Sequence, residues 1–261
     1  MRAKDLAPPR LSGRLFQVWR RNFLVWRKLA IPSMLGNLAD PMLYMLGLGF
    51  GIGSLLPEVN GTPYITFLAA GTVCYSTMNS ATFEALYSAF SRMHVQRTWD
   101  AIMNAPVGLD DIVVAEALWA ASKSFLSGLA ILSVIWILGL SRAPTMLWLI
   151  PLTLLIGLTF GSLGLSMTAL APSYDFFMYY FTLAITPMVL LCGVFFPVDQ
   201  LPPALQQVSA VLPLTHAIEL ARPLVNGRAP PAPIVHVVVL AGYALAGLYL
   251  ALVLTRRRLL T

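Results

Sequence analysis

The stretch 192-CGVFFPVDQLPPALQQVSAVLPLTHAIELARPLVNG-227 decides how the chain is organised, because it separates two apolar runs that suit membrane spans. Its five prolines each remove a backbone donor and restrict the preceding residue. What remains predicts two short helices, 204–212 and 214–224. A helix interrupted in this way is tolerated within a membrane only where its backbone is covered by protein or lines a water-filled cavity. We therefore predict re-entrant or interfacial helices within 193–227; a loop with one surface helix is the alternative.

The composition is that of a membrane protein. Of the 261 residues, 58% are hydrophobic and 11% are charged, against about 45–50% and about 25% in soluble domains. The length leaves little room for a separate soluble domain. The sequence therefore predicts an all-α polytopic membrane protein.

Charge distribution predicts the topology. Eight of the 17 basic residues precede position 30, and three more form the C-terminal cluster 256–258. Basic residues that flank apolar spans mark the cytoplasmic side, and no separate basic domain of the nucleic-acid-binding kind is present. We expect a multi-pass protein with both termini in the cytoplasm. Six spans are predicted, at 33–56, 64–88, 112–140, 146–170, 176–191 and 233–254.

The first 30 residues predict a polar, unstructured lead (1–10) and then an amphipathic helix (11–29) that Pro32 ends. Residues 31–261 form the transmembrane domain. An amphipathic basic helix of this kind lies in the headgroup region, with tryptophans as anchors; packing against other protein is the alternative. The candidate interface residues are Trp19, Arg20, Arg21, Trp26 and Arg27.

Polar residues follow one face of the second span. Ser80 and Glu84 lie on that face and Asn79 lies beside it. Such a stripe faces protein or a cavity rather than lipid. A translocation path and hydrogen bonding between helices are both consistent with it. In the fourth span, Gly157 and Gly161 predict a close approach to another helix.

The segment 90–111 is predicted to be cytoplasmic. Residues 98–106 suggest a short amphipathic helix that ends at Pro106, and Asp110 is placed to cap the next helix. A short helix on the cytoplasmic face is where a peripheral partner would act.

Catalytic and metal-binding patterns are missing from the sequence. No P-loop, H-E-x-x-H or G-x-S-x-G motif occurs, and the pair His216-x-x-Glu219 is a weak metal signal. We expect no catalytic residue and no metal. The chain is predicted to be a transport subunit that draws energy from another protein; an intramembrane enzyme acting on lipid-linked sugars is a remote alternative.

The layout resembles the permease subunits of ABC-2 type transporters. The similarity lies in 193-GVFFP-197, 212-LPLTH-216 and 222-RPLVNG-227. Further stretches resemble the permeases that export lipo-chitooligosaccharide nodulation signals. These are 19-WRRNFLVWRK-28, 35-LGNLADPMLY-44, 97-RTWD-100, 169-ALAPSYD-175 and 196-FPVDQLP-202.

The resemblance implies a fold of the type V exporter kind, in which two permease chains pair with two ABC ATPase subunits that hold ATP and Mg. It implies that the helix at 97–104 couples the two proteins, through Arg97, Trp99, Asp100 and Met103. It also implies that the re-entrant segment forms an outer lid, with Pro197, Pro202, Pro213, His216 and Glu219 as candidate residues. The candidate path residues are Asn79, Ser80 and Glu84.

The cargo that the resemblance implies is an amphipathic lipo-oligosaccharide. The alternative cargoes are a polysaccharide and a hydrophobic drug. Membrane lipids and a second copy of the chain are the other expected partners.

Overall fold

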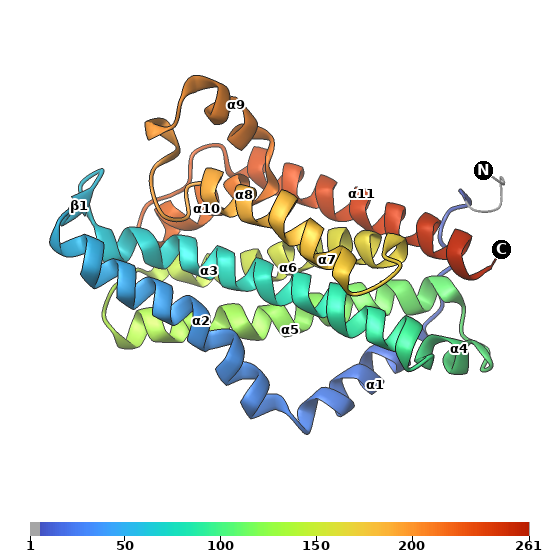
Figure 1. Ribbon diagram of the computed structural model, residues 1–261. Helices are drawn as coiled ribbons and strands as arrows, with labels where there is room; N and C mark the ends of the chain where they lie inside the picture. The colour runs from blue at the N-terminus through green and yellow to red at the C-terminus, as the bar shows by residue number, and fades with distance from the viewer. Residues whose placement is uncertain (1–5, 261) are drawn as a thin grey trace.

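The computed structural model describes residues 6–260, which form a bundle of long helices (Figure 1). In this part of the chain the sheet is a single hairpin, β1 (Glu58–Val59) with β2 (Thr62–Pro63), in which Val59 pairs with Thr62. The α-helices are α1 (Leu15–Arg27), α2 (Ala30–Gly51), α3 (Tyr64–Phe83), α4 (Thr98–Met103), α5 (Leu109–Ile137), α6 (Leu149–Leu170), α7 (Asp175–Tyr180), α8 (Thr186–Leu191), α9 (Pro203–Val211), α10 (Pro213–Val225) and α11 (Pro233–Leu259). The π-helical turns are η2 (Glu84–Ser88), η3 (Ser91–Val95) and η5 (Phe181–Ile185), and the 3-10 turns are η1 (Ile52–Ser54), η4 (Pro144–Trp148) and η6 (Val198–Gln200).

Helix α3 is the buried centre of the bundle and packs against α2, α5, α6 and α10. Its hydroxyl groups bond inside the protein: Ser76 Oγ lies 3.0 Å from Ser127 Oγ of α5, and Thr77 donates to the Val73 carbonyl at 2.7 Å. A helix that is surrounded by protein can carry polar side chains that lipid would not tolerate. This position explains the polar composition of the predicted second span.

Close packing of α6 against α5 depends on two glycines, as predicted. A Cβ at Gly157 would lie 2.9 Å from the Cα of Ala121 and 2.1 Å from Ser124 Oγ. A Cβ at Gly161 would lie 3.0 Å from the Cβ of Ala120. Small residues at such positions let two backbones approach within a membrane.

The structure supports a multi-pass membrane protein. Among the described residues, three helical stretches are long and apolar enough to cross a membrane: Leu109–Ile137, Pro144–Leu170 and Pro233–Leu259. Helices α2 and α3 have 22 and 20 residues, enough for a hydrocarbon core of about 30 Å. The stretch Asp175–Leu191 is apolar but shorter. The total of six spans remains a prediction.

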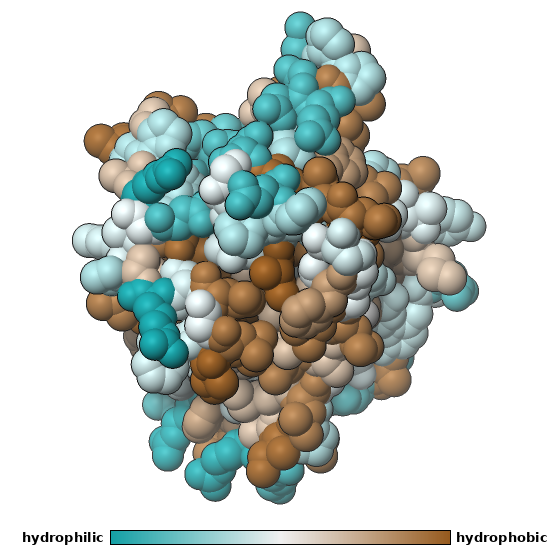
Figure 2. Space-filling view, turned by 90° about the vertical axis from the view of Figure 1, so that its left-hand side faces the viewer, coloured by the Kyte–Doolittle hydropathy of each residue, from teal (hydrophilic) through white to brown (hydrophobic). Residues whose placement is uncertain are grey.

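The predicted broken segment before the last long helix is a bent pair. Helices α9 and α10 meet at an angle of 89°, and Pro213 occupies the first turn of α10. Helix α10 packs against α3, α6 and α11, whereas α9 stands at the outer edge (top of Figure 1). Figure 2 views the end of the bundle that carries the hairpin, with hydrophilic residues gathered at the top and apolar ones across the middle. The arrangement favours a re-entrant segment over a surface loop.

The N-terminal lead differs from the prediction. Residues 1–5 lie outside the described part, but the chain from residue 6 onward is held against α5 and α11. The Ala7 carbonyl accepts from Arg256 Nη1 at 2.6 Å, and the Arg10 amide donates to Asp110 at 2.8 Å. Ser12 donates its amide to Asp111 at 2.7 Å. The expectation of an unstructured lead is therefore wrong for residues 6–10, because charged side chains of both helices bind its backbone.

The start of α5 also differs from the prediction. Asp110 lies inside the first turn instead of capping it, and its carboxylate accepts from Arg256 Nε at 2.8 Å and Nη2 at 2.7 Å. Gly108 occupies the cap position, and its amide donates to Asp111 at 3.4 Å. Asp110 is thus used for a contact with α11 that no local pattern indicates.

The chain turns sharply between α1 and α2, at the lower edge of Figure 1. The prediction that Pro32 ends the first helix is wrong, because α1 ends at Arg27 and Pro32 lies in the first turn of α2. A proline is tolerated there because the amide it lacks has no partner within the helix. The bend leaves α1 free to pack along α5.

Candidate functional site

The predicted coupling segment is a compact turn at the end of the bundle that also carries the last residues of α11 (Figure 1). Helix α3 continues through η2 and η3, and the chain then reverses at Arg97, whose φ of 50° lies in the left-handed region. A non-glycine residue with this conformation is uncommon and often marks a functional turn. The six-residue α4 follows, so the predicted short helix is present.

The four predicted coupling residues differ in exposure. The side chains of Arg97 and Asp100 are exposed, and Met103 is partly buried. Trp99 is only 1% exposed and lies in the core behind α4. Arg97 and Asp100 can therefore meet a partner directly, whereas Trp99 can act only by positioning the helix.

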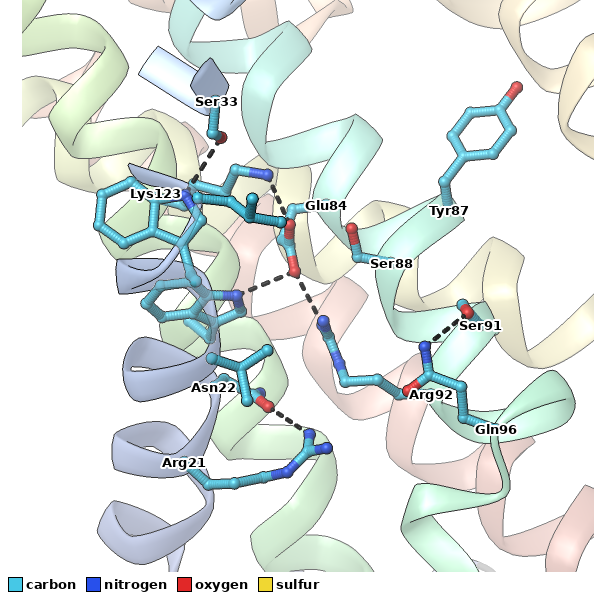
Figure 3. Close-up of a pocket in the computed structure, with 14 residues that line it drawn as sticks. Arg21, Asn22, Ser33, Glu84, Tyr87, Ser88, Ser91, Arg92, Gln96 and Lys123 are labelled. Atoms are coloured by element: carbon cyan, nitrogen blue, oxygen red, sulfur yellow. Dashed lines mark hydrogen bonds and ion pairs between the residues drawn. The ribbon is translucent and has the colours of Figure 1, made fainter. Parts of the chain in front are cut away.

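Four charged side chains meet behind α4, and we call Glu84, Arg92, Glu116 and Lys123 the charge cluster. Figure 3 shows Glu84, Arg92 and Lys123 of this cluster. Arg92 bonds to Glu84 through Nη2 at 2.8 Å and to Glu116 through Nε at 2.9 Å. Lys123 Nζ lies 2.8 Å from the second oxygen of Glu84. The carboxylates are almost fully buried, with side-chain exposures of 4% for Glu84 and 1% for Glu116. Buried charges are tolerated in this way only when they are paired and hydrogen-bonded.

Two buried indoles complete the hydrogen bonding of the carboxylates. Trp99 Nε1 of α4 donates to Glu116 at 3.2 Å, and Trp119 Nε1 of α5 donates to Glu84 at 2.9 Å. Through Trp99, the short helix α4 is connected to the charge cluster and so to α3 and α5. A movement of α4 would therefore displace side chains on both long helices.

The charge cluster also sets the electrostatics of the segments next to it. Burial opposes ionisation of Arg92, which lies beyond the predicted second span, but Glu116 and Glu84 together raise the pKa of Arg92 above its usual range. Burial and the neighbouring charge of Arg92 lower the pKa of Arg21 on α1. Both guanidinium groups remain cationic at any physiological pH.

Sequence reasoning missed the charge cluster, although a signal was present. Glu84 lies near the end of one predicted span and Glu116 near the start of the next. Antiparallel neighbours place such residues at the same depth, and opposite charges within spans usually pair. The hydrogen bonds from Arg92 and from the two indoles to these carboxylates have no such signal, because they depend on the path of the chain through η3 and α4.

The polar stripe of α3 makes contacts between helices. Ser80 is 4% exposed and accepts from Asn37 of α2 at 3.3 Å. Glu84 belongs to the charge cluster and also lines a cavity next to α1. Asn79 is partly buried. Two of the three candidate path residues, Ser80 and Glu84, therefore already bond to other side chains of the same chain.

Helix α1 uses its aromatic residues to contact α5. Trp19, Phe23 and Trp26 all lie around Trp119, with ring centroids 6.5, 6.4 and 5.8 Å away. The indoles of the two predicted anchors also donate within the chain, Trp19 to Ser122 at 3.0 Å and Trp26 to Ser33 at 3.1 Å. This face of α1 packs on protein, which was the alternative to a headgroup position for the two tryptophans.

The basic residues of α1 lie on its outward side. Arg20 and Arg27 are exposed and Arg21 is partly buried. Large apolar side chains are exposed beside them, with Phe16 at 61% and Val25 at 56%. The outer face thus has the mixed composition of a helix at a headgroup surface, and its position in a membrane remains a prediction.

The predicted lid residues are distributed over the re-entrant segment. Pro197 and Pro213 are buried, and Pro202 is exposed just before α9. His216 of α10 lies with its Nδ1 2.8 Å from Nδ1 of His236 at the start of α11. Glu219, one turn further along α10, is partly buried.

Arg222 holds the re-entrant segment to α3 and was not among the predicted lid residues. Its guanidinium donates to the Gly193 carbonyl and lies 3.9 Å from the ring centroid of Phe67. A Cβ at Gly71 would lie 2.6 Å from the Val194 carbonyl oxygen. The loop before α9 is therefore fixed against α3 by close backbone contact and by a cation–π interaction.

Comparison with known proteins is consistent with this architecture. The family model of the ABC-2 type transporter matches residues 14–225. That range runs from the start of α1 to the end of α10, and so includes α4, the charge cluster and the bent pair.

Curated relatives cover nearly the same length. The chain is 49% identical to Nodulation protein J of Bradyrhizobium diazoefficiens over 243 residues, which is 93% of each chain. It is 47% identical to Nodulation protein J of Rhizobium meliloti over 247 residues, again 93% of each chain. A more distant relative, the Inner membrane transport permease YadH of Escherichia coli, is 21% identical over 78% of this chain and 79% of its own length. The predicted resemblance is confirmed.

Proposed function

This chain belongs to the ABC-2 type transporter family, and on that basis we propose that it is the permease of an ATP-driven exporter for an amphipathic lipo-oligosaccharide. The observation that carries the proposal is the identity of 47–49% with Nodulation protein J of several rhizobia along nearly the full length. The family and the apolar helices make the chain a transport subunit and a multi-pass bacterial membrane protein.

The finer parts of the proposal concern assembly. We place the protein in the inner membrane with its termini in the cytoplasm, as two copies bound to two ABC ATPase subunits. ATP and Mg bind in those subunits. The end of the bundle that carries α4 also carries the end of α11 (Figure 1), which suits a single cytoplasmic face.

Coupling is assigned to α4. Asp100 of α4 and Arg97 just before the helix are exposed and supply opposite charges for contact with the ATPase. Trp99 holds the helix to Glu116, and Arg92 connects Glu116 to Glu84. A displacement of α4 during ATP binding thus reaches α3 and α5 through hydrogen bonds between ionised groups, which are stronger than neutral ones.

Reversing a charge on α4 is expected to uncouple the transporter. Asp100→Arg should abolish transport and the transport-linked ATPase activity while the protein still inserts and keeps its thermal stability, because the side chain is exposed. Trp99→Ala should cause the same loss together with a fall in stability of about 3–5 kcal/mol, because a buried indole is removed. ATPase assays and thermal unfolding of each complex check both results, and normal transport by Asp100→Arg would remove the coupling assignment.

Glu84 is the candidate path residue that lines a cavity. Glu84→Gln keeps the size and shape of the side chain but removes the negative charge that pairs with Lys123 and Arg92. If cargo passes this point, we expect export to fall about tenfold or more. The measurement is the initial rate of export at equal protein level. Unchanged export would mean that the stripe Asn79, Ser80 and Glu84 serves packing alone.

The function itself is tested by transport. Inside-out vesicles that contain this chain and its candidate ATPase are given a labelled acylated chitin oligomer and ATP. We expect uptake only when both chains and ATP are present. No uptake, combined with ATPase activity that responds to another glycolipid, a polysaccharide or a drug, would keep the permease assignment and reject the cargo.

A further inference from the structure

A groove of about 310 Å³ runs along the outward side of α1. Arg20, Leu24 and Lys28 are four residues apart in the sequence, so their side chains follow one another along one side of the helix. The groove therefore brings three cationic side chains to one stretch of the helix surface. Its lining residues are Gln17, Arg20, Arg21, Leu24, Val25 and Lys28.

The groove has no negative charge of its own. The chain from residue 6 to residue 39 contains six basic residues and no aspartate or glutamate. Among the described residues, none of the ion pairs includes Arg20 or Lys28, which are both exposed. The positive charge of this side of α1 is thus not compensated by the described part of the chain.

Arg21 connects the groove with the charge cluster, because it lines both the groove and the cavity beside Glu84. The two carboxylates and two cations of the cluster pair with one another, so the cluster offers Arg21 no counter-ion. Burial and the charge of Arg92 lower the pKa of Arg21, and Glu116 offsets them only in part. The hydrogen bond that Arg21 makes goes to a neutral group, since Nη1 donates to Asn22 Oδ1 at 3.0 Å (Figure 3). An anion in the groove would relieve this unfavourable environment.

Apolar side chains border the cations. Leu24 and Val25 of the lining are 40% and 56% exposed. Leu29 and Ile31, at the bend beyond the groove, are 65% and 74% exposed. Such a surface is stabilised when hydrocarbon covers it, and guanidinium and ammonium groups donate strong, charge-assisted hydrogen bonds to phosphate. A ligand that combines a phosphate with acyl chains satisfies both parts of the surface.

The course of α1 favours a lipid over a protein as the ligand. Arg14, just before α1, donates to the Pro106 carbonyl in the turn that follows α4. From there α1 leads away from α4 toward the bend (Figure 1), and Lys28 lies about 21 Å along the helix from Arg14 at about 1.5 Å per residue. A protein bound at α4 would thus meet the start of α1, whereas the groove extends over its later turns.

We propose that the groove binds the phosphate of one anionic phospholipid from the cytoplasmic leaflet. Arg20 and Lys28 donate to the phosphate oxygens from the surface, and Arg21 donates from the side of the charge cluster. The acyl chains lie against Leu24, Val25 and the exposed apolar residues of the bend. The bound lipid supplies the counter-ion that Arg21 lacks and so holds α1 in place beside the cluster. It is a component of the folded protein and not the cargo.

Binding is measured on the full chain in a neutral detergent, by the fluorescence anisotropy of a labelled phosphatidylglycerol. We expect the titration to saturate at one lipid per chain and to weaken as salt is raised, because salt screens exposed charges. Arg20→Gln and Lys28→Gln should each weaken binding about tenfold, as the loss of a hydrogen bond to a charged group would. Arg228→Gln is the matched control, because it removes the same charge from an exposed arginine ahead of α11; it should change the affinity less than twofold.

Thermal unfolding separates a loss of binding from a loss of folding. Since Arg20 and Lys28 are exposed, both variants should unfold at the wild-type midpoint in detergent alone. Added phosphatidylglycerol should raise the midpoint of wild type, because a ligand that binds the folded state stabilises it. The rise should be smaller in both variants and unchanged in Arg228→Gln.

Competitors identify the part of the lipid that is recognised. Unlabelled phosphatidylglycerol should displace the probe, whereas phosphatidylcholine, diacylglycerol and glycerol phosphate should not do so at the same concentration. The proposal is overturned if any of these three displaces the probe equally well, or if Arg20→Gln and Lys28→Gln bind as Arg228→Gln does. A titration that does not saturate near one lipid per chain would also overturn it, because diffuse attraction has no such end point.

The assay contains neither the ATPase nor the cargo, so its result is independent of the proposed export function. A wild-type chain that binds no phosphatidylglycerol, together with an Arg20→Gln variant that no longer binds its ATPase, would assign the groove to a protein surface and reject the lipid.

Discussion

Arg92→Met is expected to lower the free energy of unfolding by about 3–5 kcal/mol, because it leaves a buried carboxylate without its cation. Glu84 would still be paired with Lys123, but Glu116 would keep only the hydrogen bond from Trp99. The same change should loosen α4 and remove the response of the ATPase to cargo. Unfolding in a denaturing detergent series and the ATPase assay measure the two effects.

A second change separates charge from packing at this site. In Arg92→Met/Glu116→Gln the buried orphan charge is gone, so stability should recover in part relative to the single variant. Arg228→Met is the matched control, because that arginine is exposed and its removal should cost no more than about 0.5 kcal/mol. A double variant as unstable as Arg92→Met alone would show that the arginine acts through its volume instead of its charge.

Gly157→Leu is expected to prevent close packing of α5 and α6 and to cost about 3 kcal/mol or more. The added Cβ alone would stand 2.9 Å from the Cα of Ala121, and backbone cannot move aside as a flexible side chain can. We expect little folded protein at normal growth temperature and a lowered midpoint of thermal unfolding in what remains.

Gly242→Leu is the control for Gly157→Leu. Gly242 is an exposed glycine of α11, and a Cβ there would meet nothing within 4 Å. Replacing glycine in a helix interior favours the helix by up to about 1 kcal/mol, so this variant should fold normally. Equal loss of folded protein in both variants would mean that leucine is harmful for reasons unrelated to the α5–α6 contact.

The features that sequence predicted are those with a local cause. The prolines of 193–227 predicted the bent pair, since each proline restricts its own neighbourhood. The short helix between α3 and α5 was predicted from its amphipathic pattern, and the Gly157–Gly161 pair from its spacing. The resemblance to the ABC-2 family rested on such local motifs and is confirmed.

The features that sequence did not predict depend on contacts between distant residues. Trp19 and Trp26 look the same in sequence whether they face headgroups or Trp119. Asp110 is a good capping residue by type, and only the position of Arg256 at the end of α11 gives it another partner. The cavity between α1 and Glu84 likewise exists only because α1 folds back along α5.

The contacts that bind residues 6–12 to the start of α5 and the end of α11 have a consequence for biosynthesis. Arg256 is 249 positions from Ala7 and 146 from Asp110, so this closure can form only after the last helix has left the ribosome. Contacts between such distant positions form late in folding. Until then Asp110 lacks its arginine, and a chain that stops before α11 never acquires it. In prematurely terminated chains the N-terminal segment should therefore lack these contacts and be more accessible to proteases.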